Sequence, residues 1–149
     1  GKTPHVEFIL QSLPGNLKTA VLSRGYKRKT KGFIIAENYS FASEVGDEAC
    51  QLKHKFPETI VAVCEDRVYG INQLIRQFPD IELIILDDAF QHRRVIPKLS
   101  ILLFDYNQLF KKQTMLPSGN MREHFFNKSR ADIFIVTKNR PNGQLSLHP

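Results

Sequence analysis

Five short apolar runs, separated by segments with helical spacing, constrain the fold of this chain more than any other feature. The runs are rich in β-branched residues and nearly continuous in hydrophobicity, as parallel strands covered on both faces are. They span Thr19–Ser23, Thr59–Cys64, Leu83–Leu86, Leu99–Phe104 and Asp132–Thr137. Helical spacing follows over Phe41–Phe56, where Gly46 weakens the middle, over Val68–Phe78 and over about 122–130. The alternation predicts an α/β domain with three layers and a mostly parallel sheet.

Polar segments with Gly or Pro, at 33–40, 91–98 and 113–121, are predicted to be loops. Ligands of such sheets bind at the carboxyl ends of the strands, so these loops are where a site is expected. Residues 139–149 have turn-forming residues and no periodicity, and we interpret them as a tail or linker after a partial domain formed by 1–138.

Gly1-Lys2-Thr3, followed by Pro4 and an apolar-periodic stretch, matches the last part of a phosphate-binding loop, G-x-x-x-x-G-K-[ST]. In that motif the Lys reaches the phosphates and the Thr hydroxyl binds Mg²⁺. A chance tripeptide or an expression remnant explains the three residues equally well. On the phosphate-loop interpretation, the chain begins inside the motif and lacks the strand that precedes it.

Asp87 and Asp88 follow the apolar run Leu83–Leu86 directly. This is the form of a Walker B element, in which a strand delivers a carboxylate to the Mg²⁺ of a bound nucleotide. The alternative is an ordinary polar turn with Asp88 as a helix N-cap. The acidic pair and the opening tripeptide together favour nucleotide binding.

Two further motifs carry polar groups with open interpretations. In Gly46-Asp47-Glu48, Asp47 is either a general base for a hydroxyl substrate or a first-turn acid at a helix start. In Leu116–Glu123, Arg122 either holds a phosphate by a forked contact or forms a surface ion pair with Glu123.

Basic residues are concentrated in Arg24–Lys31, within a chain that has 21 Lys and Arg against 15 Asp and Glu. The stretch is either a solvated surface or a site of attraction for phosphate, acidic lipid or nucleic acid. Tyr26, Phe33 and Tyr39 are not spaced as a stacking platform for bases, which argues against nucleic acid.

These motifs occur in an order that strongly resembles the tetraacyldisaccharide 4′-kinase family, the lipid A 4′-kinases. The resemblance covers nearly the whole chain. It rests on Gly1–Pro4, Leu22–Gly32, Gly46–Glu48, Val63–Arg67, Leu86–His92, Leu116–Glu123 and Val136–Lys138.

The resemblance implies a P-loop kinase fold that uses ATP and Mg²⁺. It implies phosphorylation of the 4′-hydroxyl of tetraacyldisaccharide 1-phosphate, a lipid A precursor, at the cytoplasmic face of the bacterial inner membrane. An anionic membrane surface is then an expected partner, and nucleic acid is not. The anchor segment for peripheral membrane attachment is expected to lie outside this chain.

Carried over residue by residue, the resemblance gives each motif a role. The resemblance implies that Gly1, Lys2 and Thr3 bind the cofactor and that Asp47, Asp87 and Asp88 are catalytic. It implies that Mg²⁺ is bound by Thr3, Asp87 and Asp88. The implied substrate-binding residues are Arg24, Arg67, Gln91, His92, Arg122 and Glu123. The sequence departs from the family pattern at Lys27, where Gly is frequent and a stiffer loop is expected, and at Ala49, Ser118 and Asn120. No candidate is found for the family's C-terminal His, which orients the catalytic Asp.

Two functional expectations remain beside the kinase interpretation. A P-loop NTPase that couples hydrolysis to a conformational change would turn over nucleotide without an acceptor, and a basic binding module would take nucleic acid through Arg24–Lys31. Half a phosphate loop cannot enclose a triphosphate, so we expect residues 1–149 on their own not to turn over ATP.

Overall fold

The structure, a computed structural model, describes residues 2–105 and 130–138. The chain forms two compact units, Gly1–Val95 and Ile96–Pro149, and each is considered separately. Among the described residues, no helix combines the length and the apolar character needed to cross a bilayer.

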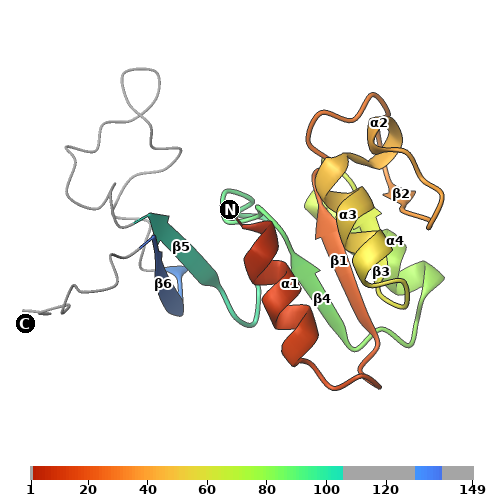
Figure 1. Ribbon diagram of the computed structural model, residues 1–149. Helices are drawn as coiled ribbons and strands as arrows, with labels where there is room; N and C mark the ends of the chain where they lie inside the picture. The colour runs from red at the N-terminus through yellow and green to blue at the C-terminus, as the bar shows by residue number, and fades with distance from the viewer. Residues whose placement is uncertain (1, 106–129, 139–149) are drawn as a thin grey trace, which may run out of the picture. The chain divides into compact units, whose positions relative to one another are not determined.

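The first unit is built on a four-stranded sheet with the order β2-β3-β1-β4 (Figure 1). Its strands are β1 Thr19–Ser23, β2 Ile34–Ile35, β3 Ile60–Val63 and β4 Leu83–Leu86. The central strand β1 runs parallel to both neighbours, with Val21 opposite Val61 on one side and Ile85 on the other. Strand β2 is antiparallel to β3. The predicted, mostly parallel α/β sheet is therefore confirmed.

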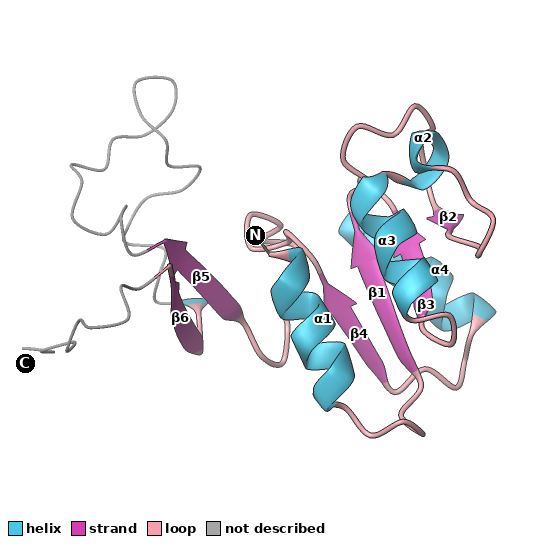
Figure 2. Cartoon of the chain, in the orientation of Figure 1, coloured by secondary structure: helices cyan, strands magenta, loops and turns pink. Residues whose placement is uncertain are grey.

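Helices cover both faces of this sheet (Figure 2). They are α1 Thr3–Ser12, α2 Ala42–Val45, α3 Asp47–Lys55 and α4 Arg67–Gln77. Pro4 stands in the first turn of α1, where its missing N–H breaks no helical hydrogen bond. Asp66 caps α4 by accepting a hydrogen bond from the Tyr69 N–H at 3.1 Å.

The core lies on the two faces of β1, all of whose residues are buried. On one face, Val21 packs with Val6 and Leu10 of α1 and with Leu52 of α3. On the other face, a second cluster joins the sheet to α4, and its buried members are Ala20, Leu22, Ala62, Cys64 and Leu74. Alternate residues of one strand thus face opposite helix layers, which explains why the interior of the run contains no polar positions.

Two local expectations need correction. The helix expected over Phe41–Phe56 is broken into α2 and α3 at Gly46, whose φ of +88° cannot continue a helix. The loop expected at 33–40 contains the two-residue strand β2, which pairs with Ala62 and Val63 of β3. A strand of two residues is too short to show an alternation of apolar and polar side chains. Its strand conformation depends on pairing with β3, which is distant in the sequence.

In the second unit, the described strands β5 Ile101–Asp105 and β6 Ile133–Thr137 pair in parallel. The rings of Phe104 and Phe134 stack with their centroids 5.9 Å apart. The helix predicted over about 122–130 lies almost entirely outside the described residues, as do the loop at 113–121 and the tail at 139–149.

Candidate active site at the carboxyl edge of the sheet

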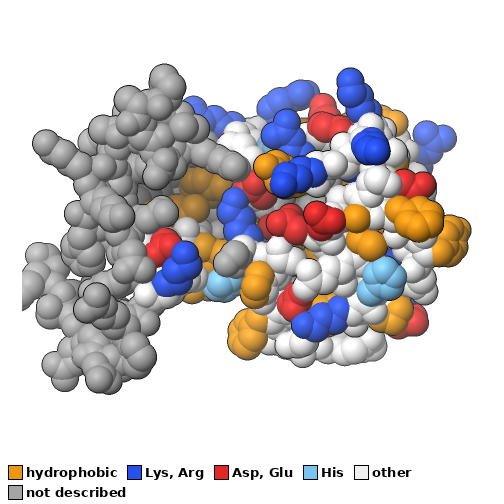
Figure 3. All heavy atoms as spheres, turned by 45° about the horizontal axis from the view of Figure 1, so that its top comes forward, with side chains coloured by type: hydrophobic (Ala, Val, Ile, Leu, Met, Phe, Trp, Pro, Cys, Tyr) orange, Lys and Arg blue, Asp and Glu red, His pale blue; other side chains and the backbone are white. Residues whose placement is uncertain are grey.

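The polar motifs of the first unit converge where β1, β3 and β4 end and where the major helices begin (Figure 1). Arg24 follows β1, Arg67 opens α4 just after β3, and Asp87 follows β4. The parallel strands and the right-handed crossovers bring these positions to one edge. Figure 3, turned toward this end, shows basic and acidic side chains side by side.

Lys2 and Asp88 meet at this edge, although they lie at opposite ends of the first unit's sequence. The Lys2 ammonium forms an ion pair with the Asp88 carboxylate, and both side chains are partly exposed. Lys2 precedes the first residue of α1, and the half-buried Thr3 begins that helix. The structure thus places Lys2 beside the acidic pair, as the nucleotide-binding interpretation requires.

Asp87 is a buried carboxylate in an acidic environment. Its residue is 5% exposed, and its N–H donates to the Leu22 carbonyl at 3.0 Å, which extends the β1–β4 pairing by one step. Burial raises the pKa of Asp87, and the charges of Glu48 and Asp88 raise it further, while Lys2 opposes them. Ionised Asp87 is therefore a group that gains from a cation beside it.

The chain turns sharply after Asp87. Asp88 adopts a φ of +49°, which residues other than glycine rarely do. The Gln91 side-chain amide donates to the Asp88 carbonyl at 2.9 Å and closes the turn. Strained backbone of this kind persists where the surroundings enforce it, and it is frequent at functional sites.

Asp47 and Glu48 open α3, in agreement with the helix-start alternative. Asp47 is exposed, and the charge of Glu48 reaches Asp87. The break at Gly46 makes this placement possible, because a continuous helix would carry the two acids along its side. A general-base role for Asp47 stays a prediction.

Arg67 differs from the exposed phosphate ligand that its charge suggests. It is 1% exposed, and its guanidinium donates to the Asp87 carbonyl at 3.0 Å and to the Cys64 carbonyl. Arg67 thus ties together the ends of β3 and β4. Burial lowers the pKa of Arg67, with the Asp88 and Asp87 carboxylates acting in the opposite direction.

A cavity of about 540 Å³ opens beside Arg67. Its lining consists of Glu65, Asp66, Arg67, Val68, Gln91, His92, Arg93, Arg94 and Val95. Burial lowers the pKa of His92 most, and the nearby charges of Arg67 and Arg24 lower it further. Arg24 follows β1, and its charge acts on two cavity-lining residues, Arg67 and His92. The group favours an anionic ligand over a cationic one.

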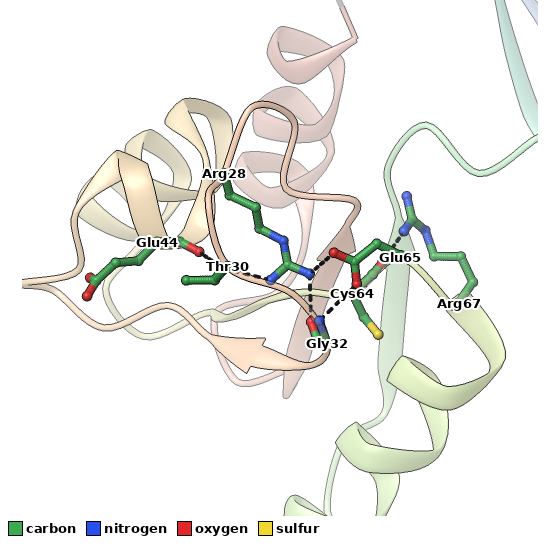
Figure 4. Close-up of polar contacts among 7 residues, drawn as sticks. All are labelled: Arg28, Thr30, Gly32, Glu44, Cys64, Glu65 and Arg67. Carbon is green, nitrogen blue, oxygen red and sulfur yellow. Dashed lines mark hydrogen bonds and ion pairs between the residues drawn. The ribbon is translucent and has the colours of Figure 1, made fainter.

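One residue of the basic stretch was misjudged from its charge alone. The Arg28 side chain is 2% exposed and pairs with Glu65 at 2.6 Å, so it does not belong to the solvated surface (Figure 4). Lys27 has a φ of +62°, which explains why glycine is favoured at this position in the resemblance. The sequence could have predicted that Glu65 lies at the carboxyl edge of the sheet, because Glu65 directly follows a buried apolar run.

Some predicted residues lie outside the described part of the chain, namely Gly1, Arg122 and Glu123. Groups of three or more His, Cys, Asp or Glu side chains that could hold a metal by themselves are absent from the described residues. A metal with few protein ligands is compatible with this result, since Mg²⁺ usually takes one or two carboxylates together with substrate phosphates and waters.

Comparisons with known proteins point to one family. The family model described as tetraacyldisaccharide-1-P 4′-kinase matches residues 1–148. The tetraacyldisaccharide 4′-kinase of Phocaeicola vulgatus is 53% identical over 140 residues, which cover 93% of this chain and 38% of the relative. The protein of the same name from Bacteroides thetaiotaomicron is 52% identical over 93% of this chain and 37% of its own length. The chain thus spans about two fifths of the length of these curated relatives.

A solved structure is also similar. The crystal structure of LpxK from Aquifex aeolicus in complex with ATP matches with a TM-score of 0.82 and 37% identity, over 93% of this chain and 44% of that one.

Proposed function

The chain belongs to the tetraacyldisaccharide-1-P 4′-kinase family, and we propose that it carries the nucleotide-binding and phosphoryl-transfer centre of such a kinase. The protein containing it transfers the γ-phosphoryl group of ATP to the 4′-hydroxyl of tetraacyldisaccharide 1-phosphate in lipid A biosynthesis. The contact between Lys2 and Asp88 carries this proposal, because it joins the end of a phosphate-binding motif to the acidic strand end.

Thr3, Asp87 and Asp88 are the residues that would hold Mg²⁺ beside the nucleotide. Their hydroxyl and carboxylate oxygens are the hard ligands that Mg²⁺ prefers. The raised pKa of Asp87, caused by burial and then by Glu48 and Asp88, fits a site that a cation completes. When bound, Mg²⁺ would neutralise charge on the β- and γ-phosphates.

The chain's own residues position the reactants. The Lys2 ammonium lies beside Asp88 and would contact the transferring phosphoryl group, while Arg67 holds the backbone around Asp87 in place. Asp47, exposed at the start of α3, would accept the proton of the attacking 4′-hydroxyl. Phosphoryl transfer depends chiefly on such positioning and charge stabilisation.

The acceptor phosphate would bind at the cavity beside Arg67. Gln91 and His92 line this cavity, and we propose that Arg24, Arg122 and Glu123 join them in binding the acceptor. A guanidinium beside an imidazole suits a sugar phosphate, because both groups can donate hydrogen bonds to its oxygens.

An anionic membrane surface, at the cytoplasmic face of the inner membrane, is the proposed setting. Exposed aromatic and basic side chains occupy the loops that follow β1 and β2. They are Tyr26, Lys27, Lys29, Lys31, Tyr39 and Phe41. Aromatic rings favour the lipid headgroup region, and lysines are attracted to anionic lipids.

Asp47→Asn in the intact protein tests the proposal. Phosphoryl transfer from radiolabelled ATP to tetraacyldisaccharide 1-phosphate should fall by about 10²–10⁴-fold, the usual worth of a general base. ATP affinity should be unchanged, because Asp47 does not contact the nucleotide in this scheme. Asp80→Asn is the matched control, since Asp80 is an exposed acid that pairs with Lys18 before β4, at the opposite edge of the sheet.

Full transfer by Asp47→Asn would contradict the role of Asp47. ADP release by the wild-type protein at the same rate with and without the lipid disaccharide would favour the NTPase alternative instead.

A further inference from the structure

The loop 24–32 is held at the site by an ion pair between the enclosed side chain of Arg28 and the exposed side chain of Glu65. We propose that Arg28 and Glu65 form a positioning clamp that keeps the loop beside the cavity and thereby sets the affinity for the phosphorylated acceptor, not for ATP. The proposal rests on the proposed function for the identity of the acceptor, and its structural part can be tested without turnover.

Arg28 is the inner half of the clamp. Its guanidinium donates to the Gly32 carbonyl and to Glu65, both at 2.6 Å, and to the Thr30 hydroxyl at 3.5 Å (Figure 4). Its Nε is buried without a hydrogen-bond partner among the described residues. A cation this enclosed needs its carboxylate, because the charge has little water around it. The pairing therefore fixes the path of the loop.

Glu65 is the outer half, and it joins the loop to the cavity. One of its carboxylate oxygens accepts from Arg28, and the other accepts the Gly32 N–H at 3.0 Å. Burial acts to raise the pKa of Glu65, but hydrogen bonds from its own N–H, Arg28 and Gly32 outweigh it and lower the pKa. Glu65 lines the cavity two residues before Arg67, so the clamp binds the loop directly to the segment that forms the site.

The opposite side of the loop is anchored separately. The Lys29 N–H donates to the Ser43 carbonyl at 2.8 Å, and the Thr30 hydroxyl donates to the Glu44 carbonyl. The loop therefore cannot drift away from α2 when the clamp is removed. What the clamp adds is the attachment of the loop to Glu65, which lies after β3 and lines the cavity.

The clamp and the nucleotide side of the site use different ion pairs. Lys2 pairs with Asp88 at the end of β4, whereas Arg28 pairs with Glu65 at the end of β3. Displacing the loop should then weaken acceptor binding and leave ATP binding intact. A general loss of folding would instead affect both substrates.

Glu65→Ala, Arg28→Ala and the double variant test the clamp in the intact protein. We expect the KM for tetraacyldisaccharide 1-phosphate to rise about 10- to 100-fold in each, as for a small misplacement of a binding group, with the KM for ATP unchanged. The double variant should cost no more than either single one, since both break the same interaction. Glu65→Gln keeps an oxygen for Arg28 and should recover most of the affinity.

Matched controls remove an equivalent charge elsewhere. Glu58→Ala lies just before β3, as Glu65 lies just after it, and Arg76→Ala removes an exposed cation in the last turn of α4. Both controls should leave the two KM values at the wild-type level.

Two measurements do not require turnover. Hydrogen exchange of the Gly32 amide, which donates to Glu65, should accelerate in Glu65→Ala while β1 stays protected. Binding of glucosamine 1-phosphate, followed by ligand-observed NMR, should weaken at least about tenfold in the clamp variants. Wild-type binding of this probe by a protein that transfers no phosphoryl group to tetraacyldisaccharide 1-phosphate would count against the proposed function alone.

Three results would overturn the clamp. They are parallel increases in the KM for ATP, additive effects in the double variant, and unchanged Gly32 exchange in Glu65→Ala.

Discussion

Replacing Gly46 by alanine tests whether the break between α2 and α3 is required by the fold. At a φ of +88° and a ψ of +152°, a region essentially restricted to glycine, any L-residue is strained by about 1–3 kcal/mol. A Cβ here would also lie 2.9 Å from the Tyr26 carbonyl oxygen and 3.1 Å from the Gly25 carbonyl carbon. Both are backbone atoms, so relief requires moving the loop, and overpacking of this kind costs about 1–3 kcal/mol.

Two other glycines separate these effects. Gly32 has a φ of +79° but open space where a Cβ would lie, so Gly32→Ala should cost only the backbone strain, about 1–2 kcal/mol. Gly15 has neither restriction, and Gly15→Ala should be close to neutral or stabilise by up to about 1 kcal/mol. Gly46→Ala should therefore be the most destabilising of the three, by about 2–6 kcal/mol.

Urea unfolding of the intact protein, followed by far-ultraviolet circular dichroism, measures the difference. With slopes of about 1–3 kcal/mol/M, Gly46→Ala should lower the midpoint by about 1 M or more relative to Gly15→Ala. Because Gly25 and Tyr26 follow Arg24, acceptor binding should weaken as well. Equal midpoints for Gly46→Ala and Gly15→Ala would refute the reasoning, and equal midpoints for Gly46→Ala and Gly32→Ala would refute its steric part.

The ionisable groups give three further expected outcomes. Burial, and then the charges of Glu48 and Asp88, raise the pKa of Asp87 in the folded protein. The contribution of Asp87 to the free energy of unfolding is therefore present below its unfolded-state pKa and is lost as pH rises through its folded-state pKa. Asp87→Asn should therefore raise the thermal midpoint relative to wild type at pH 7, and the two midpoints should become equal near pH 3. The same variant should have no phosphoryl transfer. The hydrogen bond from the Tyr69 N–H lowers the pKa of Asp66, so Asp66→Ala should lower the midpoint at pH 7, and scans at falling pH should show the difference vanish below the folded pKa. Burial raises the pKa of the Cys64 thiol, so mass spectrometry after brief alkylation of the native protein at pH 8 should find Cys64 unmodified, and modified after unfolding in urea.

The architecture was predictable where burial leaves a continuous signal. All five residues of β1 are buried beneath helices on both faces, and the sequence shows a matching uninterrupted run. The acidic pair was found for the same reason, since a strand end fixes the edge to which Asp87 belongs. Strand β2 left no such signal, because two isoleucines acquire a strand conformation only through their pairing with β3.

The parts of the site that sequence patterns missed depend on the paths of loops. Counting charges placed Arg28 with the exposed lysines, but the turn after β1 directs its side chain toward Glu65 and buries it. Arg67 was expected to bind substrate, and its guanidinium is used in part to join two strand ends. A sequence gives the charge of each residue, whereas its partner depends on long-range geometry that no local pattern encodes.

The charge arrangement at the carboxyl edge makes physical sense only with ligands present. A buried Asp87 beside Asp88 and Glu48 opposes folding at neutral pH. The enclosed Arg67 donates to two backbone carbonyls, and burial disfavours its charge. Hydrophobic packing on both faces of β1 supplies the stability that tolerates these groups. A bound cation and anion would each relieve one part of this cost, and ligand present at about 100 times its dissociation constant adds about 2.7 kcal/mol of stability. On the proposed function, a nucleotide with its metal and a phosphorylated acceptor would be these ligands, and the charges that weaken the empty fold would then increase its affinity for them.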